Sequence, residues 1–392
     1  MNCAERTELR GIKYIGFAET TGYGNAAHAL FSTLQKTKIP VSYCGIQPGN
    51  TEQGGQIVHE INVGSYHSVI VHTVPEYFPY WLQKEKQRNP QVRVWGYTTW
   101  ETDNIPGHWK DILNTMDGIF VPCHWNKKVF QQCGVSAPIE VLPHISQYHG
   151  TAPVSNIANA QLEDILKSAR GKCILYNIGV WSERKAPELL IQAFCEEFTA
   201  ADNICLILKT GNADWSSYKR NWRTLFRKSV GTAARAMTSS LKRYKNNAAI
   251  FHITDTLSEE DIQHLHLQGS CFVSLARGEG WGMGAYEATW FNKPVIITGY
   301  GGVMDYLSSA NSFLVNYTLS PVQTAFGNNS YSSSQSWALA DIQHARRLMR
   351  LVYEQPALAS SKGLSAGKQV QIQFNNTTII NHLLTVLHDQ NT

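Results

Sequence analysis

The sequence predicts an α/β protein made of two doubly wound domains. The chain has 392 residues, and at ~150 residues per domain this length suggests two domains. Short β-rich runs alternate with helical patterns along most of the chain, which is typical of parallel sheets with crossover helices. Residues 144–159 contain few large apolar side chains and separate two series of this alternation. We interpret them as a linker.

The first series begins with a strand at residues 12–16 and a helix at about 25–37. Further β-rich runs predict strands at residues 41–44, 68–72, 92–97, 118–121 and 139–142. Helical patterns lie between the later runs, near residues 76–86, 109–115 and 126–132. Because helices separate the strands, the strands are expected to lie parallel in one sheet.

The second series repeats this organisation. Strands are expected at residues 173–178, 204–209, 247–253, 271–275 and 295–298, and helices at residues 186–198, 259–267 and 284–291. A polar, turn-rich loop follows at residues 319–335, and the tail predicts helices at residues 342–354, 356–364 and 378–387. Two doubly wound halves place a ligand cleft between them, at the carboxyl ends of their strands.

The composition excludes several classes of protein. With 43% hydrophobic and 16% charged residues, the chain is not largely disordered. A net charge of +4 does not by itself indicate a nucleic-acid partner. No apolar run approaches the ~18–20 residues of a membrane span, and the first residues lack the apolar core of a signal peptide. The eight cysteines form no C-x-x-C pair, which suits free thiols in a reducing compartment. A cytoplasmic protein is expected.

The run most informative about chemistry is SLARGEGWGMGAYE, at residues 274–287. It follows a predicted strand and leads into a predicted helix, and its four alternate glycines allow a tight turn and close approach to a ligand. The helix start offers unpaired N–H groups and the positive end of a dipole. Glu279 in the turn and Glu287 in the helix can accept bidentate hydrogen bonds from vicinal hydroxyls. Acidic residues at a helix start also occur without a ligand, but the glycines favour a site for a phosphate and sugar.

This run resembles the E-x7-E signature of retaining glycosyltransferases of family four, also called glycosyl transferases group 1. The family's usual E-G-F-G-L-P-x-x-E corresponds to E-G-W-G-M-G-A-Y-E from Glu279 to Glu287. N-K-P-V-I at residues 292–296, G-G-V-M-D at 301–305 and the segment GVWSERKAPELLIQAF at 179–194 resemble further parts of the family pattern. The resemblance is best from about residue 117 to residue 315.

The resemblance implies the GT-B fold, in which two Rossmann-like domains face each other across a cleft. An acceptor-side domain would span residues 1–150, a nucleotide-sugar-binding domain 151–370, and a helix at 371–392 would pack back on the first domain. The implied activity is transfer of a sugar from a UDP- or GDP-linked donor to an acceptor hydroxyl, with retention of configuration. Polysaccharide or lipopolysaccharide assembly is the expected setting, with a glycan, lipid-linked or protein acceptor. No cofactor is implied, and no metal is expected because the chain lacks a D-x-D motif and histidines at ligand spacing.

The resemblance also assigns roles to single residues. Glu279 would contact the donor sugar, Lys185 would neutralise the diphosphate, and Glu287 would hold the ribose hydroxyls. Other donor contacts are assigned to the first-domain glycines Gly22 and Gly24, to Thr254 after a strand, and to the turn residues Gly280, Trp281, Gly282, Met283 and Gly284. A solvated lysine at a helix start and a plain strand–helix turn are the alternatives for Lys185 and for the two first-domain glycines.

Two departures from the family pattern concern charge. The family often has an arginine about five residues before the lysine, where this chain has Gly179 and Val180. Arg184 is the nearest replacement, although neighbouring side chains at a helix start are expected to point in different directions. The family's first-domain histidine is missing from the T-T-W-E run at residues 98–101. Glu101 is therefore the candidate catalytic group of the first domain, with His108 as the second choice.

Residues 216–250 contain nine basic residues and no acidic one. One interpretation is an inserted helix that packs its apolar stripe on the domain and exposes its basic face. The other is peripheral contact of residues 216–246 with an anionic membrane surface, on the inner face of the membrane. The segment is not a nucleic-acid-binding motif.

Two other functions compete with glycosyl transfer. A sugar-nucleotide epimerase or a phosphorylase uses the same architecture. A non-catalytic nucleotide-sugar-binding protein would bind the donor without turnover.

Overall fold

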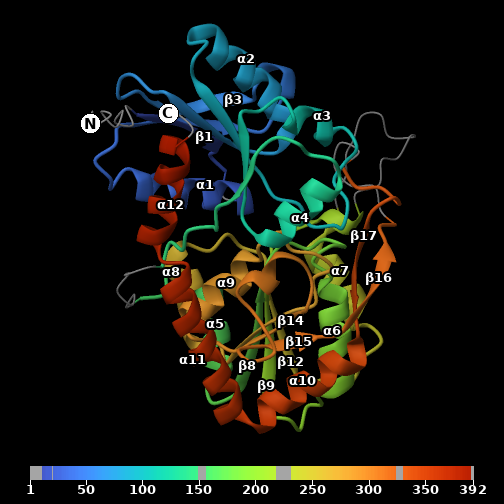
Figure 1. The fold of residues 1–392 in the computed structure, drawn as a ribbon. Coiled ribbons are helices and arrows are strands. Elements are labelled where there is room, and N and C mark those ends of the chain that lie inside the picture. Colours follow the sequence, from blue (N-terminus) through green and yellow to red (C-terminus); the bar gives the residue numbers. More distant parts are fainter. Residues whose placement is uncertain (1–10, 20, 149–155, 218–230, 324–329, 390–392) are drawn as a thin grey trace. The chain divides into compact units, whose positions relative to one another are not determined.

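The structure is a computed structural model, and it describes residues 11–19, 21–148, 156–217, 231–323 and 330–389. The chain divides into two compact units. Unit 1 comprises Met1–His149 and Ile372–Thr392, and unit 2 comprises Gly150–Gln371 (Figure 1). The expected domain boundary at residues 150–151 lies outside the described residues.

Unit 1 is built on a seven-stranded sheet in the order β3-β2-β1-β4-β5-β6-β7. Its strands are β1 (Ile12–Phe17), β2 (Val41–Gln47), β3 (Gln56–Ile61), β4 (Ser68–His72), β5 (Arg93–Tyr97), β6 (Gly118–Val121) and β7 (Ile139–Val141). Neighbouring strands are parallel except β2 and β3, which pair antiparallel. The strand order reverses direction between β1 and β4, which makes the carboxyl ends of these two strands the switch point of the sheet.

Five helices accompany this sheet: α1 (Gly22–Leu34), α2 (Phe78–Arg88), α3 (Trp109–Leu113), α4 (His124–Gln132) and α12 (Asn376–Asp389), with short 3-10 turns at Thr51–Gln53 and Pro75–Tyr77. The last helix, red in Figure 1, packs against α1, so the end of the chain returns to the unit that contains its start. The side-chain amide of Asn376 donates to the carbonyl of Ser146 at 3.2 Å, close to where the chain leaves unit 1.

Unit 2 contains a six-stranded parallel sheet in the order β12-β9-β8-β13-β14-β15. The strands are β8 (Cys173–Ile178), β9 (Ile204–Lys209), β12 (Ala249–Ile253), β13 (Cys271–Ser274), β14 (Val295–Thr298) and β15 (Phe313–Val315). Two small antiparallel pairs stand beside it: β10 (Ala213–Asp214) with β11 (Gly231–Thr232), and β16 (Tyr317–Pro321) with β17 (Ser336–Ala340). The switch point of the main sheet lies between β8 and β13.

The helices of unit 2 are α5 (Ala160–Ser168), α6 (Pro187–Glu197), α7 (Ala233–Leu241), α8 (Glu259–Gln268), α9 (Met283–Trp290), α10 (Ile342–Glu354) and α11 (Pro356–Gln373), with 3-10 turns at Trp215–Ser217 and Gly301–Asp305. Side-chain caps fix several starts. Ser258 accepts a hydrogen bond from the Asp261 amide at α8, and Asp341 accepts one from the His344 amide at α10. Such caps satisfy N–H groups that a helix start leaves open.

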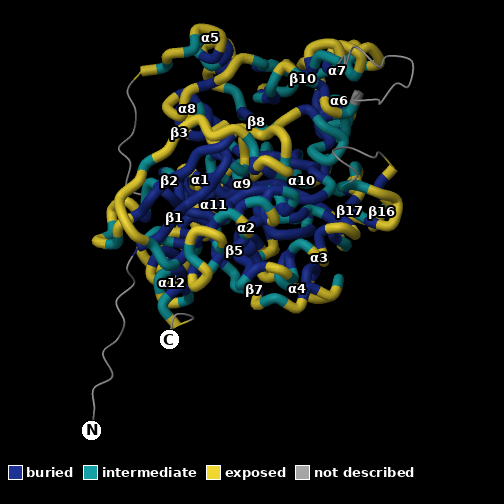
Figure 2. The backbone as a smooth tube through the Cα atoms, turned by 90° about the horizontal axis from the view of Figure 1, so that it is seen from above, coloured by how far each residue is buried: buried dark blue, intermediate teal, exposed yellow. Residues whose placement is uncertain are grey.

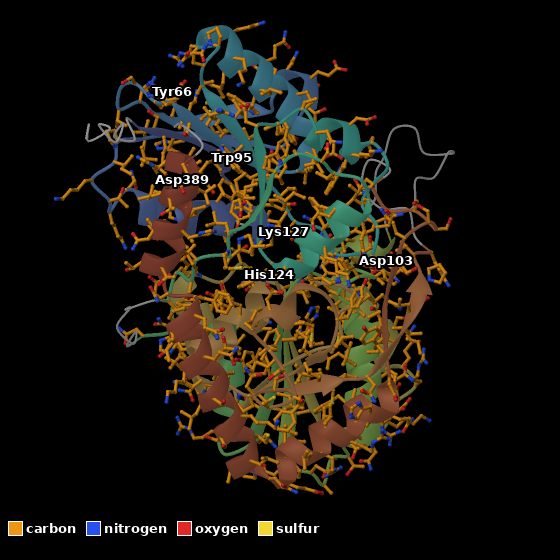
Figure 3. All side chains as sticks on the ribbon, viewed as in Figure 1. Tyr66, Trp95, Asp103, His124, Lys127 and Asp389 are labelled. Atoms are coloured by element: carbon orange, nitrogen blue, oxygen red, sulfur yellow. The ribbon has the colours of Figure 1, made fainter. Side chains whose placement is uncertain are left out.

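The strands form the interior of each unit, as the dark blue segments of Figure 2 show. In unit 1 every residue of β1 is buried, including the charged Lys13. Its ammonium group donates to Glu85 Oε1 on α2 at 2.7 Å, and the Tyr66 hydroxyl, labelled in Figure 3, donates to the other oxygen of Glu85 at 2.6 Å. A buried charge requires such partners, because burial without them is costly.

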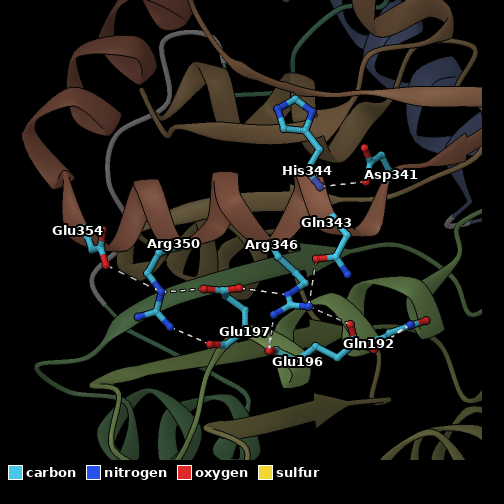
Figure 4. Close-up of polar contacts among 9 residues, drawn as sticks. All are labelled: Gln192, Glu196, Glu197, Asp341, Gln343, His344, Arg346, Arg350 and Glu354. Atoms are coloured by element: carbon cyan, nitrogen blue, oxygen red, sulfur yellow. Dashed lines mark hydrogen bonds and ion pairs between the residues drawn. The ribbon is translucent and has the colours of Figure 1, made fainter.

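In unit 2, an ion network joins α10 to α6 (Figure 4). Glu197 receives Arg346 Nε at 3.2 Å and Arg350 Nε at 2.9 Å. Arg350 also contacts Asp202 at 2.8 Å, and its guanidinium lies 4.4 Å from the centre of the Phe198 ring. These ion pairs hold α10 against α6.

Two parts of the fold differ from the prediction, and a third is described only in part. The antiparallel β3 was not expected, because its residues are exposed and carry no buried face. The expected loop at 319–335 begins inside β16 and leads to β17. The basic segment at 216–250 contains β11, α7 and the first residues of β12, while residues 218–230, which carry five of its nine basic side chains, lie outside the described residues. None of the described helices is both long and apolar enough to cross a membrane.

Candidate functional site

Most of the residues assigned from the sequence lie at the switch point of unit 2. The loop after β8 carries Arg184 and Lys185, and the loop after β13 carries Glu279 and the glycine-rich turn. These two strands are neighbours in the sheet, so both loops leave from the same edge. Ligands of open α/β sheets bind at such points.

Glu279 joins the two loops. Its side chain is buried, with 8% of the residue exposed. Lys185 Nζ donates to Oε1 at 2.6 Å, and Arg184 Nη1 donates to Oε2 at 3.3 Å and to the carbonyl of Gly278 at 2.8 Å. Two cations around one carboxylate leave an excess of one positive charge.

The convergence of Arg184 and Lys185 corrects an expectation. These neighbours were expected to point in different directions, as they would on a helix. The helix α6 begins only at Pro187, and Ala186 before it has the left-handed φ of 47°. Arg184 is therefore in a turn, where its carbonyl accepts from the Arg277 amide at 2.7 Å. This non-helical backbone lets both side chains reach Glu279.

The ion pairs decide the charge of Glu279. Burial alone raises the pKa of a carboxyl group, because it disfavours the charged form. Lys185 and Arg184 outweigh this effect and hold the pKa of Glu279 below its usual value of 4.5. Glu279 is therefore ionised at neutral pH, when it can accept hydrogen bonds from hydroxyl groups.

The turn itself is held by residues from the 3-10 turn after β14. The Gly302 amide donates to the Glu279 carbonyl at 2.7 Å. The Tyr306 hydroxyl donates to the carbonyls of Trp281 and Gly282 at 2.8 and 3.1 Å. The family pattern drew attention to the glycine pair at 301–302, but nothing in the sequence marked Tyr306. With these carbonyls fixed, the shape of the turn is set before any ligand binds.

Gly282 caps the start of α9 with a φ of 80°. A Cβ atom at Gly282 would lie 2.7 Å from Val303 Cγ1, so the turn has no room for a larger residue. Met283 and Gly284 form the first positions of α9. Trp281 is a core residue, with its ring 5.0 Å from the rings of both Tyr286 and Tyr306. The turn thus presents backbone groups and the positive end of a helix.

Glu287 lies one turn into α9 and is also buried, at 7% exposure. Its Oε2 atom is 3.7 Å from His266 Nε2 on α8. The sequence did not assign His266 any role. Thr254 follows β12, which is the edge strand beside β9. Glu287 and Thr254 thus belong to the same unit as Glu279.

The remaining assigned residues belong to unit 1, near the switch point of its sheet. Gly22 and Gly24 lie at the start of α1, directly after β1, and Glu101 follows β5. Tyr23, between the glycines, bonds through its hydroxyl to Thr98 Oγ1 at 3.0 Å and donates to the Thr99 carbonyl at 3.1 Å. Burial raises the pKa of Tyr23, and the nearby Glu101 carboxylate adds to the rise. Unit 1 therefore brings its two predicted segments together.

Two other predicted features have structural explanations. A Cβ atom on Gly24 would lie 1.7 Å from the Glu19 carbonyl oxygen, so this glycine is required by the fold itself. At Gly22 a Cβ atom would meet nothing within 4 Å. His108, the second choice in unit 1, pairs with Glu76 at 2.8 Å. Among the described residues, no three His, Cys, Asp or Glu side chains are grouped to hold a metal ion.

Comparison with known proteins agrees with this geometry. Residues 160–321 match the model of the family "Glycosyl transferases group 1". No curated protein is similar enough to count as a relative. Anabaena Alr3699/HepE in complex with UDP and glucose is 13% identical, with a TM-score of 0.64 over 97% of this chain and 100% of that chain. Sucrose-phosphate synthase from Thermosynechococcus elongatus is 13% identical, with a TM-score of 0.67 over 97% of this chain and 98% of that chain.

A glycosyltransferase from Rickettsia africae is 13% identical, with a TM-score of 0.64 over 98% of this chain and 99% of that one. At these identities the solved structures establish the fold, and the family model covers most of the unit that carries the glutamate pair. Residues 160–321 thus carry the pattern of the glycosyl transferases group 1 family, and the chain as a whole has the GT-B fold of these solved structures.

Proposed function

We propose that this chain transfers a sugar from a nucleotide-diphosphate donor to an acceptor hydroxyl of a glycan or a lipid-linked glycan, with retention of configuration. The observation that carries the proposal is the group of Glu279, Lys185 and Arg184 at the start of α9. It combines an ionised carboxylate, which suits sugar hydroxyls, with two cations and a helix start, which suit a diphosphate.

Charge movement explains how this group would act. As the bond between the sugar and the diphosphate breaks, positive charge develops on the sugar and negative charge on the leaving oxygen. Lys185, Arg184 and the amides of the Trp281–Gly284 turn stabilise the leaving diphosphate. Glu279 holds the sugar hydroxyls next to the reacting carbon. The departing phosphate accepts the acceptor's proton on the same face, so the new bond forms with retention.

The remaining donor contacts are assigned by element. Glu287 binds the ribose hydroxyls, and Thr254 lies next to the base of the nucleotide. In unit 1, the roles of Gly22 and Glu101 stay predictions from the sequence. Anabaena Alr3699/HepE is known in complex with UDP-glucose, which makes this the first donor to test. GDP-linked sugars are the second group. The pathway is the assembly of a polysaccharide or lipopolysaccharide.

The test compares Glu279→Gln with Glu163→Gln, which changes a carboxylate on α5 that pairs with Lys167 on the same helix. The assay follows release of nucleotide from UDP- and GDP-sugars, with and without acceptor glycans. We expect Glu279→Gln to lower the rate about 100-fold or more, because an ionised group next to the developing charge is lost. Loss of the two ion pairs also lowers the melting temperature, so both variants are assayed well below it, and the loss of rate should far exceed the loss of folded protein. Full activity in Glu279→Gln would contradict the assigned role of Glu279 at the donor sugar.

The same assay distinguishes the competing functions through its products. An epimerase converts the donor sugar without releasing nucleotide. A phosphorylase requires inorganic phosphate. A non-catalytic binding protein retains the donor unchanged with every acceptor.

A further inference from the structure

We propose that His266 is a positioning residue of the donor site, which orients the Glu287 carboxylate toward the ribose hydroxyls. The inference rests on the proposed function, because it takes Glu287 as the carboxylate that binds ribose. His266 lies on α8, outside the glycine-rich motif and on a different helix from Glu287.

The His266 ring is held from three directions inside unit 2. It is fully buried. Its Nδ1 atom is 2.9 Å from the Tyr176 hydroxyl on β8, and its Nε2 atom is 3.7 Å from Glu287 Oε2 on α9. The ring also stacks on Phe291, with centroids 5.1 Å apart and an interplanar angle of 8°. Phe291 follows Glu287 by about one helical turn, so the ring is fixed relative to the carboxylate.

These partners favour one tautomer of the ring. A carboxylate oxygen accepts hydrogen bonds, so the tautomer with its proton on Nε2, the nitrogen that faces Glu287, gives an attractive contact. The Nδ1 atom is then an acceptor, and the Tyr176 hydroxyl donates to it. Burial raises the pKa of Tyr176 well above its usual value, so this hydroxyl keeps its proton. In histidine sites generally, the hydrogen bond made by one ring nitrogen determines whether the other nitrogen carries the proton. Here the hydrogen bond is the one between Tyr176 and Nδ1.

The His266 ring restricts the rotation of the Glu287 carboxylate group. At 3.7 Å, the contact is longer than a hydrogen bond, so the Nε2–H group acts by charge–dipole attraction and the ring acts by its bulk. One carboxylate oxygen is drawn toward α8, and the other is left for the vicinal hydroxyls of a ribose. A carboxylate held in this way loses less rotational freedom when the nucleotide binds.

The experiment measures dissociation constants by calorimetry for UDP and 2′-deoxy-UDP, and for GDP and 2′-deoxy-GDP. His266→Phe keeps a flat ring against Phe291 and removes both nitrogens. Its matched control is His264→Phe, two residues earlier on the same helix. We expect the wild type and the control to prefer the ribonucleotide roughly tenfold or more. In His266→Phe this preference should fall to about two- to threefold, with the affinity for the deoxynucleotide unchanged.

Two further variants protect the test against a folding defect. Tyr176→Phe removes only the hydroxyl that selects the tautomer, and it should reduce the ribose preference in part. His266→Gln returns an amide N–H to the position near Glu287, and it should restore part of the preference lost in His266→Phe. A purely structural role would change the affinity for both nucleotides of a pair equally.

The outcomes separate this inference from the proposed function. If Glu287→Gln abolishes the ribose preference while His266→Phe retains it, the positioning role is wrong and the ribose role of Glu287 stands. If the wild type itself does not distinguish the two nucleotides, the assignment of Glu287 fails, and the inference fails with it. Absence of binding by all four nucleotides overturns both.

Discussion

Glu279 is a buried carboxylate that must stay ionised and must still be available to a ligand. Burial opposes the first condition, and the two flanking cations restore it. Their side chains remain about one-fifth exposed, so each can also face solvent or an anion. The same three residues therefore form a stable ion group, and in the proposed function they also bind the sugar diphosphate.

The two cations lead to a prediction about nucleotide affinity. Lys185→Ala and Arg184→Ala should each weaken binding of UDP about tenfold or more, because each removes a charge-assisted contact with the diphosphate. Binding of uridine, which has no phosphate, should change little. Titration of both ligands into each variant measures the difference. Equal losses for uridine and UDP would show that the cations act on the fold rather than on the phosphates.

A second prediction at this scale concerns pH. Burial lowers the pKa of His144 to about 3 from its usual 6.5. The unfolded chain therefore takes up a proton below pH 6.5 while the folded chain does not. The stability contributed by the neutral ring is complete above pH 6.5, and it is lost at about 1.4 kcal/mol per pH unit as the pH falls toward 3.

Chemical denaturation of the wild type and His144→Phe between pH 7 and pH 5 tests this expectation. The variant should lose less stability on acidification than the wild type. His28→Phe, an exposed position on α1, serves as the control and should keep the slope of the wild type. An unchanged slope in His144→Phe would contradict the account.

At the scale of elements, the turn between β1 and α1 contains two glycines, and only one of them is required by the space around it. Gly24→Ala places a methyl group 1.7 Å from the Glu19 carbonyl, so it should destabilise unit 1 by about 1–3 kcal/mol. Gly22→Ala enters open space and should leave the melting temperature unchanged. Loss of stability in Gly22→Ala would be inconsistent with the open position.

The ion network between α6 and α10 leads to a prediction about salt. Glu197 contacts two arginines at part-buried positions, so Glu197→Gln should lower the free energy of unfolding by about 1–2 kcal/mol. The loss should shrink in 1 M salt, where charges are screened. Glu163→Gln, which breaks an exposed pair on one helix, should cost less than about 0.5 kcal/mol. Equal effects of the two substitutions would contradict the role of the network.

The elements also explain what the sequence could predict. Strands such as β4 and β6 are buried on both faces and mostly apolar, and this pattern is typical of a buried parallel strand. The exposed β3 has no such pattern, because it is defined by its pairing with β2. At the site, the glycines and glutamates of the turn were evident from spacing. The placement of Arg184 was not, because it depends on the left-handed Ala186, and the contacts of Tyr306 and His266 depend on tertiary packing.

At the scale of the whole molecule, the two units repeat one principle. Each has a sheet whose order reverses beside its first strand, and each has its assigned residues on the loops at that point. The chain enters unit 2 once, and through α11 and α12 it returns to unit 1. Unit 2, which carries the glutamate pair and both cations, contains the family match. We therefore expect a nucleotide diphosphate to bind in unit 2.

Thermal unfolding with UDP, GDP, ADP, CDP and dTDP tests this claim most directly. A ligand at 100 times its dissociation constant stabilises the folded state by about 2.7 kcal/mol, which raises the melting temperature by several degrees. We expect such a shift with one nucleotide, UDP first, in the wild type and in Glu163→Gln, and a smaller shift in Lys185→Ala. No shift with any nucleotide at millimolar concentration would contradict a donor site in unit 2.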